Sequence, residues 1–178
     1  MAPVNEAQIK AFIRDIPDFP EPGIVFKDIT PLLGDPTAFA ATVEGLANAF
    51  SGEIDKVVGI EARGFIFGAP VATRLHAGFV PMRKPGKLPY DVSAQHYALE
   101  YGTDSLEVHS DAIDPGDRVL VVDDVLATGG TGAASLDLVR AAGADVVGFV
   151  VVVELGFLNG RQRLGDVPVV SLVSYAGT

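Results

Sequence analysis

The stretch Val119-Leu120-Val121-Val122-Asp123-Asp124-Val125-Leu126-Ala127-Thr128-Gly129-Gly130-Thr131 joins an apolar run to two acids and a turn rich in glycine and threonine. Its first four residues predict a strand that is buried on both faces, as in a parallel sheet with helices on each side. The two acids would then mark the carboxyl end of the strand, the edge of an open α/β sheet where ligands bind. Elsewhere in the chain, strand patterns alternate with helix patterns, which indicates an α/β fold with a central, mostly parallel sheet flanked by helices.

The turn that follows the acids has the composition of a phosphate-binding loop. Gly129 and Gly130 permit positive φ angles and close backbone approach, so the N–H groups of residues 127–131 can point at one phosphate. The two threonine hydroxyls in this turn add donors, and a helix expected over about residues 132–142 adds its positive end. The turn therefore predicts an anion site at the end of the strand.

The acids, and the motifs that are missing, narrow the choice of ligand. Asp123 and Asp124 could hold ribose hydroxyls directly or through a divalent cation. The run has neither the Gly-Lys-Ser/Thr of a nucleoside-triphosphate P-loop nor the three-glycine dinucleotide fingerprint. The alternative is an apolar strand followed by two solvated acids and an ordinary glycine-rich turn. Residues 128–131 taken alone would favour that alternative. The full ordered run is more specific and predicts a site for a phosphorylated sugar.

Composition sets further bounds. A chain of 178 residues at 48% hydrophobic is long enough for one well-buried domain over 1–178 and short for two. The longest apolar run, 146–153, is interrupted by Gly148 and predicts a buried strand, with no membrane span. A formal net charge of −10 argues against nonspecific binding of nucleic acid. The lack of cysteine excludes disulfides and thiol catalysis, and with no export signal in residues 1–6 it leads us to expect a cytoplasmic protein.

Periodicity and breakers predict the remaining elements. The proline-rich segment 16–23 is expected to be an extended loop without helix. The polar segment from 83 to about 96 is expected to be a mobile excursion that returns through residues 97–101. The other expectations are helices over 7–15, 35–50 and from about 64 to 76, strands over 56–60, 78–82, 146–153 and 167–173, and a strand edge at 106–109.

The run at 119–131 resembles the phosphoribosyl pyrophosphate (PRPP) motif of the type I phosphoribosyltransferases. Four further segments resemble the adenine-specific members of that family, in the family's order and spacing: Pro17-Asp18-Phe19-Pro20-Glu21-Pro22-Gly23-Ile24-Val25-Phe26-Lys27-Asp28, Arg63-Gly64-Phe65, Arg83-Lys84-Pro85-Gly86-Lys87-Leu88-Pro89 and Leu99-Glu100-Tyr101-Gly102. The resemblance extends from about residue 16 to residue 172. It implies the type I phosphoribosyltransferase fold, with a small base-recognising hood over about residues 1–34 and a flexible catalytic loop over about residues 83–100.

The reaction that the resemblance implies is the displacement of pyrophosphate from PRPP by adenine, which gives AMP and belongs to purine salvage. It also implies a homodimer and Mg²⁺ that is carried by PRPP, with the two acids as candidate ligands. Two alternatives stay open: the same fold acting on a 6-oxopurine or another base, and a regulator that binds PRPP or nucleotide without turnover. The segments at 17–28 and 99–102 favour adenine, and the basic segment at 83–89 favours catalysis.

The resemblance also implies roles for the polar residues. Ala127, Thr128, Gly129, Gly130 and Thr131 would hold the 5′-phosphate, and Asp123 and Asp124 would face the ribose. The cations that would meet pyrophosphate and its Mg²⁺ are Arg63, Arg83, Lys84 and Lys87. Alone, Arg63 would be interpreted as part of a surface salt bridge, but its position just past a predicted strand end favours the role in binding. For the other three residues, a solvated loop is the competing interpretation.

Purine recognition would use Phe26 as a stacking plane, with the backbone of Val25 and Lys27 reading the amino-substituted edge. The family often has arginine at the position of Lys27, which weakens a role for that side chain and leaves the backbone role. Leu155 resembles the apolar residue on the other face of the base. Without the resemblance, Phe26 and Leu155 would be interpreted as core residues.

Glu100 is the candidate acid/base, because a carboxylic group on a closing loop could exchange a proton with a purine ring nitrogen. Tyr101 would help to close the site, although an ordinary strand edge also explains both residues. The turn Glu61-Ala62-Arg63 resembles the family loop that carries a cis peptide bond not involving proline.

Overall fold

A five-stranded sheet forms the centre of the molecule in the computed structural model, which describes residues 5–98 and 103–177. The strand order is β4-β3-β7-β8-β9, and each neighbouring pair is parallel. The strands are β3 (Lys56–Ile60), β4 (Gly78–Met82), β7 (Arg118–Leu126), β8 (Asp145–Leu155) and β9 (Val169–Tyr175). The prediction of an α/β fold around a parallel sheet is therefore confirmed.

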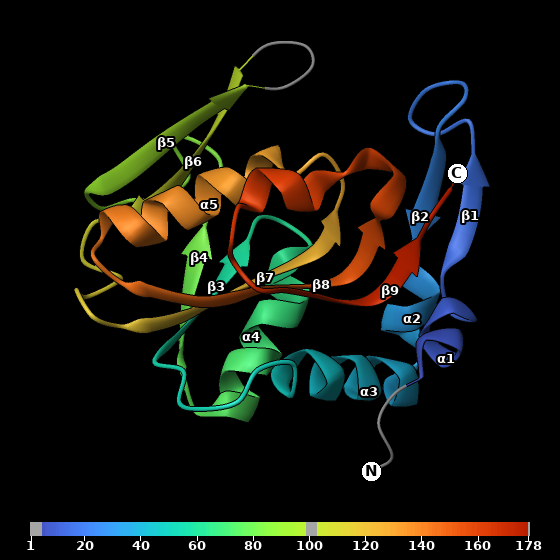
Figure 1. Ribbon diagram of the computed structural model, residues 1–178, viewed down its shortest axis with the longest axis horizontal. Coiled ribbons are helices and arrows are strands. Elements are labelled where there is room, and N and C mark those ends of the chain that lie inside the picture. The colour runs from blue at the N-terminus through green and yellow to red at the C-terminus, as the bar shows by residue number, and fades with distance from the viewer. Residues whose placement is uncertain (1–4, 99–102, 178) are drawn as a thin grey trace.

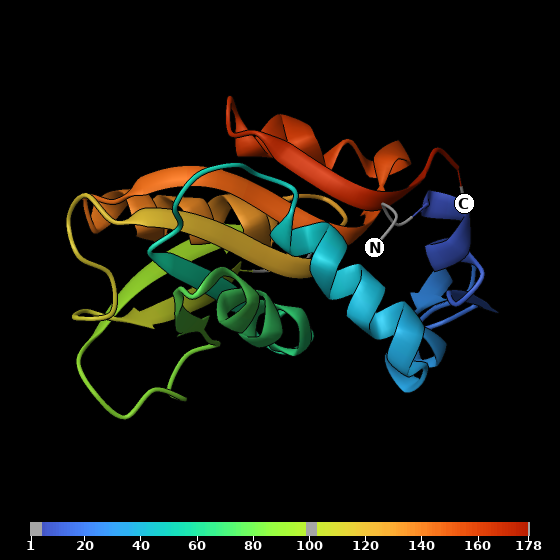
Figure 2. The same ribbon diagram turned by 90° about the horizontal axis from the view of Figure 1, so that it is seen from below.

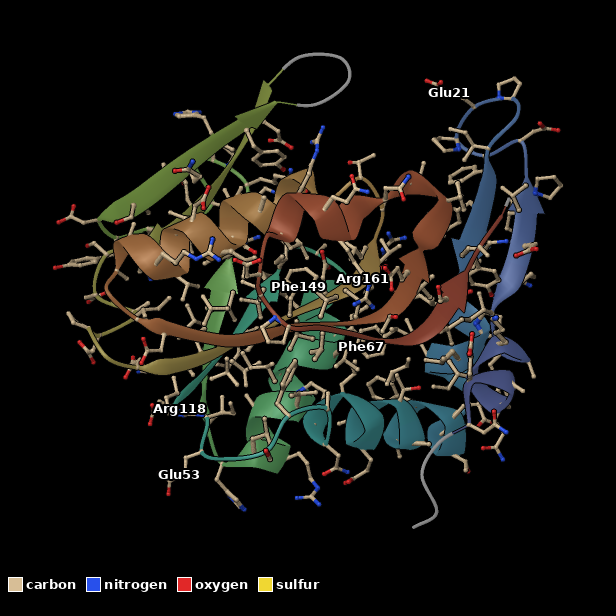
Figure 3. All side chains as sticks on the ribbon, in the orientation of Figure 1. Glu21, Glu53, Phe67, Arg118, Phe149 and Arg161 are labelled. Carbon is tan, nitrogen blue, oxygen red and sulfur yellow. The ribbon has the colours of Figure 1, made fainter. Side chains whose placement is uncertain are left out.

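Helices cover both faces of this sheet. Figures 1 and 2 show α3 (Pro36–Ala47) and α4 (Gly64–Leu75) on one face and α5 (Gly130–Ala141) on the other. Each face has its own hydrophobic cluster: Phe67 of α4 packs against Phe39 with ring centroids 5.8 Å apart, and Phe149 of β8 lies on the side of α5 (Figure 3). Because both faces are buried, the central strands are continuous apolar runs.

The connections create a crevice between β3 and β7. These strands are neighbours, but the helix that follows β3 packs on one face of the sheet and the helix that follows β7 packs on the other. At such a switch point the two connections diverge at the carboxyl ends of the strands and leave space for a ligand. The residues after both strands, 61–63 and 127–131, meet at this place.

Two antiparallel hairpins stand at opposite ends of the molecule (Figure 1). One pairs β1 (Arg14–Pro17) with β2 (Val25–Asp28), next to the short helices α1 (Glu6–Lys10) and α2 (Thr30–Gly34). The other pairs β5 (Val92–Ala98) with β6 (Thr103–His109). Two 3-10 helices, η1 (Gly156–Leu158) and η2 (Gly160–Leu164), connect β8 to β9. Within the described segments, every helix falls short of the length and apolar character that a membrane span requires.

Several predicted elements agree with the structure. Strands over 56–60 and 78–82 are confirmed with the same bounds, and no helix interrupts residues 16–23. The helix predicted from residue 35 is also confirmed, because the carboxylate of Asp35 accepts hydrogen bonds from the N–H groups of Thr37 and Ala38. This helix ends at Ala47, three residues before the predicted end.

Other predicted bounds were wrong. The helix expected over 7–15 ends at Lys10, because the chain must turn into β1, where Arg14 pairs with Asp28 at 2.6 Å. The strand expected to stop before the acids continues through them to Leu126, and α5 begins at residue 130. Residues 92–96, expected within an irregular excursion, and residues 97–98, expected in the return from it, form β5 because they pair along their whole length with β6.

Candidate active site

A cavity of about 300 Å³ lies at the carboxyl ends of β3 and β7. It is lined by the turn after β3, by the acids in β7 and by the loop that opens α5. Its lining includes nine of the candidate site residues: Arg63, Lys84, Asp123, Asp124, Ala127, Thr128, Gly129, Gly130 and Thr131. Glu61, the first residue after β3, also lines it. The switch point of the sheet thus brings together polar groups from distant parts of the chain.

Of the two glycines in the loop at residues 127–131, Gly129 has the positive φ that the sequence allowed, and Gly130 is the first residue of α5. Gly129 has a φ of +83° and caps the N-terminus of α5, a conformation that strains residues with a Cβ. A Cβ at Gly129 would also overlap the backbone carbonyl of Gly160, and a Cβ at Gly160 would overlap the carbonyl oxygen of Ala127. The loop therefore depends on a second glycine, 31 positions away from the first along the chain, which the sequence did not reveal.

The two acids differ in their surroundings. Nε of Arg63 lies 2.7 Å from a carboxylate oxygen of Asp124, which is 5% exposed. Burial and the neighbouring carboxylate of Asp124 raise the pKa of Asp123 well above its ordinary range. Burial also raises the pKa of Asp124, and the Arg63 guanidinium opposes that effect. The pair thus forms a concentrated, partly neutralised acidic centre on the floor of the cavity.

Glu61 binds the basic segment through two cationic side chains and one backbone N–H group. Its carboxylate accepts hydrogen bonds from Nη2 of Arg83 (3.2 Å), the backbone N–H of Lys84 (2.8 Å) and Nζ of Lys87 (2.6 Å). Burial works to raise the pKa of Glu61, but these hydrogen bonds outweigh it and hold the pKa at about 2. The peptide bond between Glu61 and Ala62 is cis, as the resemblance implied. Glu61 was not among the candidate residues, although it is the first residue after its strand.

Lys84 joins the basic segment to the hairpin β5–β6 and to the phosphate loop. Its Nζ donates to the hydroxyl of Tyr97 (2.9 Å) and pairs with Asp104. The same hydroxyl lies 3.1 Å from Asp104 and accepts a hydrogen bond from Thr131 at 3.3 Å. Burial disfavours the ammonium, but the hydrogen bonds with Asp104 and Tyr97 prevail and raise the pKa of Lys84. Sequence reasoning missed Tyr97 and Asp104, because only the pairing of β5 with β6 brings them to the site.

A second, mostly apolar cavity of about 190 Å³ adjoins the first. Val25, Phe26 and Lys27 of β2 line one side, and Leu155 at the end of β8 lines another. The guanidinium of Arg63 lies 5.3 Å from the ring centroid of Phe26. The hairpin β1–β2 thus contributes one wall of a site whose other walls come from the sheet.

The side chain of Lys27 has structural partners. Its Nζ lies 2.8 Å from the carboxylate of Asp15 and 4.3 Å from the centroid of the Tyr175 ring. The Lys27 side chain is 6% exposed, so it is engaged within the molecule. These contacts agree with the expectation that the backbone at residue 27 matters more than the side chain.

The two cavities share four residues, which are Arg63, Asp124, Val125 and Ala127. One ligand could therefore place a flat apolar group in the smaller cavity and a phosphorylated group in the larger one. Arg83 and Lys87 contact Glu61 at the rim and do not line either of these cavities. Glu100 and Tyr101 lie outside the described residues.

The donor set does not favour a metal held by protein alone. Within residues 5–98 and 103–177, His, Asp and Glu side chains form no cluster of three or more that could hold a metal ion. Asp124 is engaged by Arg63, and Asp123 accepts the backbone N–H of Asp124 at 2.9 Å. Two carboxylates beside an anion site suit a divalent cation that arrives bound to a polyphosphate and takes most of its ligands from that group and from water.

A parallel sheet with a phosphate loop at its switch point, two acids in the same strand and an adjoining apolar cavity define a phosphoribosyltransferase. The family of the phosphoribosyl transferase domain matches residues 35–172 of the chain. The more similar relatives place the chain within this class: it belongs to the adenine phosphoribosyltransferases.

Three relatives carry this assignment. The adenine phosphoribosyltransferase of Thermobifida fusca (strain YX) is 60% identical over 167 residues, which are 93% of this chain and 95% of the relative. The crystal structure of adenine phosphoribosyltransferase from Rhodothermus marinus DSM 4252 is 56% identical and superposes with a TM-score of 0.90, over 95% of this chain and 97% of that chain. The Saccharomyces cerevisiae enzyme, in complex with adenine and an imino-altritol bisphosphate, is 40% identical with a TM-score of 0.89, over 94% and 97%.

Proposed function

We propose that this chain is an adenine phosphoribosyltransferase, which transfers the 5-phosphoribosyl group of PRPP to adenine and gives AMP and pyrophosphate. The observation that carries the proposal is the pair of adjoining cavities, one apolar and one built around a phosphate loop, with Arg63 and Asp124 in both walls. The Saccharomyces cerevisiae relative in complex with adenine supports the choice of base.

Adenine would occupy the smaller cavity. Phe26 would stack on one face of the purine and Leu155 would contact the other. The N–H and C=O groups of Val25 and Lys27 would recognise the amino-substituted edge. This assignment makes the hairpin β1–β2 the base-recognising part of an N-terminal hood over about residues 1–34.

PRPP would occupy the larger cavity. Backbone N–H groups and hydroxyls of residues 127–131 would bind the 5′-phosphate at the N-terminus of α5. Lys84 and Arg63 would face the pyrophosphate. Arg83 and Lys87 would join them by exchanging the carboxylate of Glu61 for the ligand. After such an exchange, Arg83 and Lys87 would still be paired with a negative group, and the basic segment would cover the bound ligand.

The acids suit the carbon centre that reacts. Displacement of pyrophosphate gives the ribose oxocarbenium character, so positive charge develops beside Asp123 and Asp124. A carboxylate that is already in place beside this carbon would stabilise such charge more in the transition state than in the ground state. The acids would also bind the ribose hydroxyls. Mg²⁺, when bound with PRPP, would neutralise the departing pyrophosphate.

Glu100 would exchange the proton of the purine ring nitrogen that forms the bond to ribose, and Tyr101 would help to close the site; both roles rest on the sequence resemblance. We expect Glu100→Gln to lower kcat by about a hundredfold, because general acid–base catalysis contributes on that order, and to change the KM for PRPP little. Steady-state kinetics measure both quantities. Unchanged turnover in Glu100→Gln would remove the acid/base role.

Assembly and location complete the proposal. We propose a homodimer, as the resemblance implies, and a cytoplasmic location, as the lack of cysteine suggests. Sedimentation of the purified chain measures its mass, and a monomer at micromolar concentration would refute the dimer.

The reaction is tested by incubating the purified protein with PRPP and Mg²⁺ and with adenine, hypoxanthine or guanine in turn. The proposal predicts AMP and pyrophosphate from adenine and little product from the 6-oxopurines. Product from a 6-oxopurine alone would show that the acceptor is another base. Tight binding of PRPP without any product would favour a regulator.

A further inference from the structure

A bidentate ion pair lies behind the phosphate loop, outside the residues that line either cavity. Arg161 of η2 donates from Nε to one carboxylate oxygen of Glu154 at 2.5 Å and from Nη2 to the other at 2.7 Å. The same carboxylate accepts the hydroxyl of Ser171 at 2.7 Å, and Nη1 of Arg161 donates to the carbonyl of Val169 at 2.7 Å. Three elements, β8, η2 and β9, are thus joined at one place, where Figure 3 labels Arg161.

The pair holds η2 in a defined orientation. Two parallel N–H···O bonds between a planar guanidinium and a carboxylate fix direction as well as distance. Glu154 is 8% exposed. Because side chains alternate along β8, it lies on the face opposite Val153 and Leu155, which line the smaller cavity. The pair is therefore positioned to orient η2, which lies on that opposite face.

One end of η2 contacts the segment that would bind phosphate, and the other end contacts the first turn of α5, which follows that segment. At its first residue, Gly160 approaches the backbone of Ala127 and Gly129 so closely that a Cβ would overlap a carbonyl oxygen. At its last residue, Leu164 is buried against Gly132 of α5, where an added Cβ would lie 2.9 Å from a methyl group of Leu164. η2 therefore supports the phosphate loop at Ala127 and Gly129, and the helix that follows the loop at Gly132.

We propose that Arg161 is a positioning residue for the 5′-phosphate: its ion pair with Glu154 holds Gly160 against residues 127–129 and so sets the directions of the loop N–H groups. This role rests on the proposed binding of PRPP by that loop. Arg161 itself touches no substrate. Its loss would move donors by a fraction of an ångström, which weakens a charge-assisted site more than it disturbs the fold.

Kinetics and binding test this role with Arg161→Met, the double variant Glu154→Gln/Arg161→Met, and Gly160→Ala. The double variant leaves no unpaired buried carboxylate, so it separates positioning from the cost of an orphaned charge. Gly160→Ala keeps the ion pair and disturbs the loop directly. Arg74→Met is the matched control, because Arg74 of α4 pairs with Glu44 of α3 at 2.6 Å, away from the residues that line the two cavities.

We expect all three variants to raise the KM for PRPP by about tenfold or more, with kcat and the KM for adenine within about threefold of the wild type. Calorimetry should show a parallel loss of affinity for ribose 5-phosphate, and Arg74→Met should change neither quantity. A melting temperature lowered in both Arg161 variants, with the KM for PRPP and the ribose 5-phosphate affinity unchanged, would overturn the proposal.

Two further outcomes are informative. Should Arg161→Met fail to fold, Gly160→Ala and Arg161→Lys decide the question, since lysine keeps the charge without the bidentate geometry and should reproduce part of the KM increase. Should the wild type bind ribose 5-phosphate and yet form no AMP, the proposed reaction fails, while the calorimetric comparison still tests the positioning role.

Discussion

Gly64, the first residue of α4, has its backbone pressed against the acids of β7. A Cβ at this position would lie 2.9 Å from Oδ1 of Asp123 and 3.0 Å from the carbonyl oxygen of Val122. The carbonyl of Val122 is part of the backbone, and Oδ1 of Asp123 accepts the backbone N–H of Asp124 at 2.9 Å, so a shift of either atom breaks native geometry. We expect Gly64→Ala to displace Asp123 and to lower kcat/KM by about tenfold or more, measured in the AMP-forming assay.

Gly34→Ala is the control for this substitution. Gly34 is the last residue of α2, and an added Cβ would meet no heavy atom within 4 Å there. The change adds the same methyl group to a helix terminus without touching the site, so kcat/KM should stay within about twofold of the wild type. Equal kinetic effects of the two variants would contradict the role given to the Gly64 contact.

Glu61 should make the stability of the fold depend on pH. Its pKa in the folded protein is about 2, below the ordinary value of 4.5, because hydrogen bonds from Lys87, Lys84 and Arg83 outweigh burial. A carboxylate with a lowered folded pKa stabilises the fold above its unfolded pKa, and this contribution is lost as the pH falls from about 4.5 towards about 2. The melting temperature of the wild type should therefore exceed that of Glu61→Gln above pH 4.5, and the difference should shrink below it.

Melting curves of both proteins at several pH values measure this difference, with Glu53→Gln as a control at an exposed carboxyl group. A difference that is constant from pH 6 to pH 3 would show that the three hydrogen bonds do not stabilise the charged form. Growth of the difference at low pH would have the wrong sign and would refute the assignment.

At the scale of elements, β3 and β4 were predictable from sequence because their apolar runs are short, continuous and bounded by turn residues. The strand β5 was not predictable, since residues 92–98 are mostly small or polar and form a strand by pairing with β6. The helix η2 was not predicted for a similar reason. Its place behind residues 127–129 depends on a glycine contact that no local pattern encodes.

The hairpin β5–β6 is coupled to the phosphate loop through one hydroxyl. Tyr97 of β5 joins Lys84, Asp104 and Thr131 by hydrogen bonds of its OH group. Tyr97→Phe keeps the ring and removes this junction, so Lys84 should lose part of its orientation towards pyrophosphate. We expect kcat/KM for PRPP to fall by about tenfold, the equivalent of about 1.4 kcal/mol, in steady-state kinetics.

Tyr90→Phe is the control on the same segment of chain, because Tyr90 is 61% exposed and packs edge-on against His109. Its kinetics should match those of the wild type. A loss in Tyr97→Phe that is no greater than the loss in Tyr90→Phe would show that the hairpin folds over the site without orienting Lys84.

At the scale of the whole molecule, the site joins parts that the sheet alone does not connect. The motif residues at 119–131 were predictable, since a strand end and a phosphate loop are contiguous in sequence. The smaller cavity combines β7 and β8 of the central sheet with β2 of a separate hairpin, so its closeness to the phosphate loop depends on the strand order and on how that hairpin packs against the sheet. A nucleotide that fills both cavities should therefore stabilise the fold as a unit.

AMP should raise the melting temperature through this linkage. At a concentration of about 100 times its Kd, a ligand adds about 2.7 kcal/mol to the free energy of unfolding, which for a chain of this length corresponds to about 5–10 °C. Thr128→Ala removes a hydroxyl from the phosphate loop and should weaken AMP about tenfold, so at the same AMP concentration the gain falls to about 1.4 kcal/mol, about half the shift. Adenosine lacks the phosphate and should shift both proteins equally. Equal AMP shifts in the wild type and Thr128→Ala, measured by calorimetric melting, would contradict the placement of the phosphate at residues 127–131.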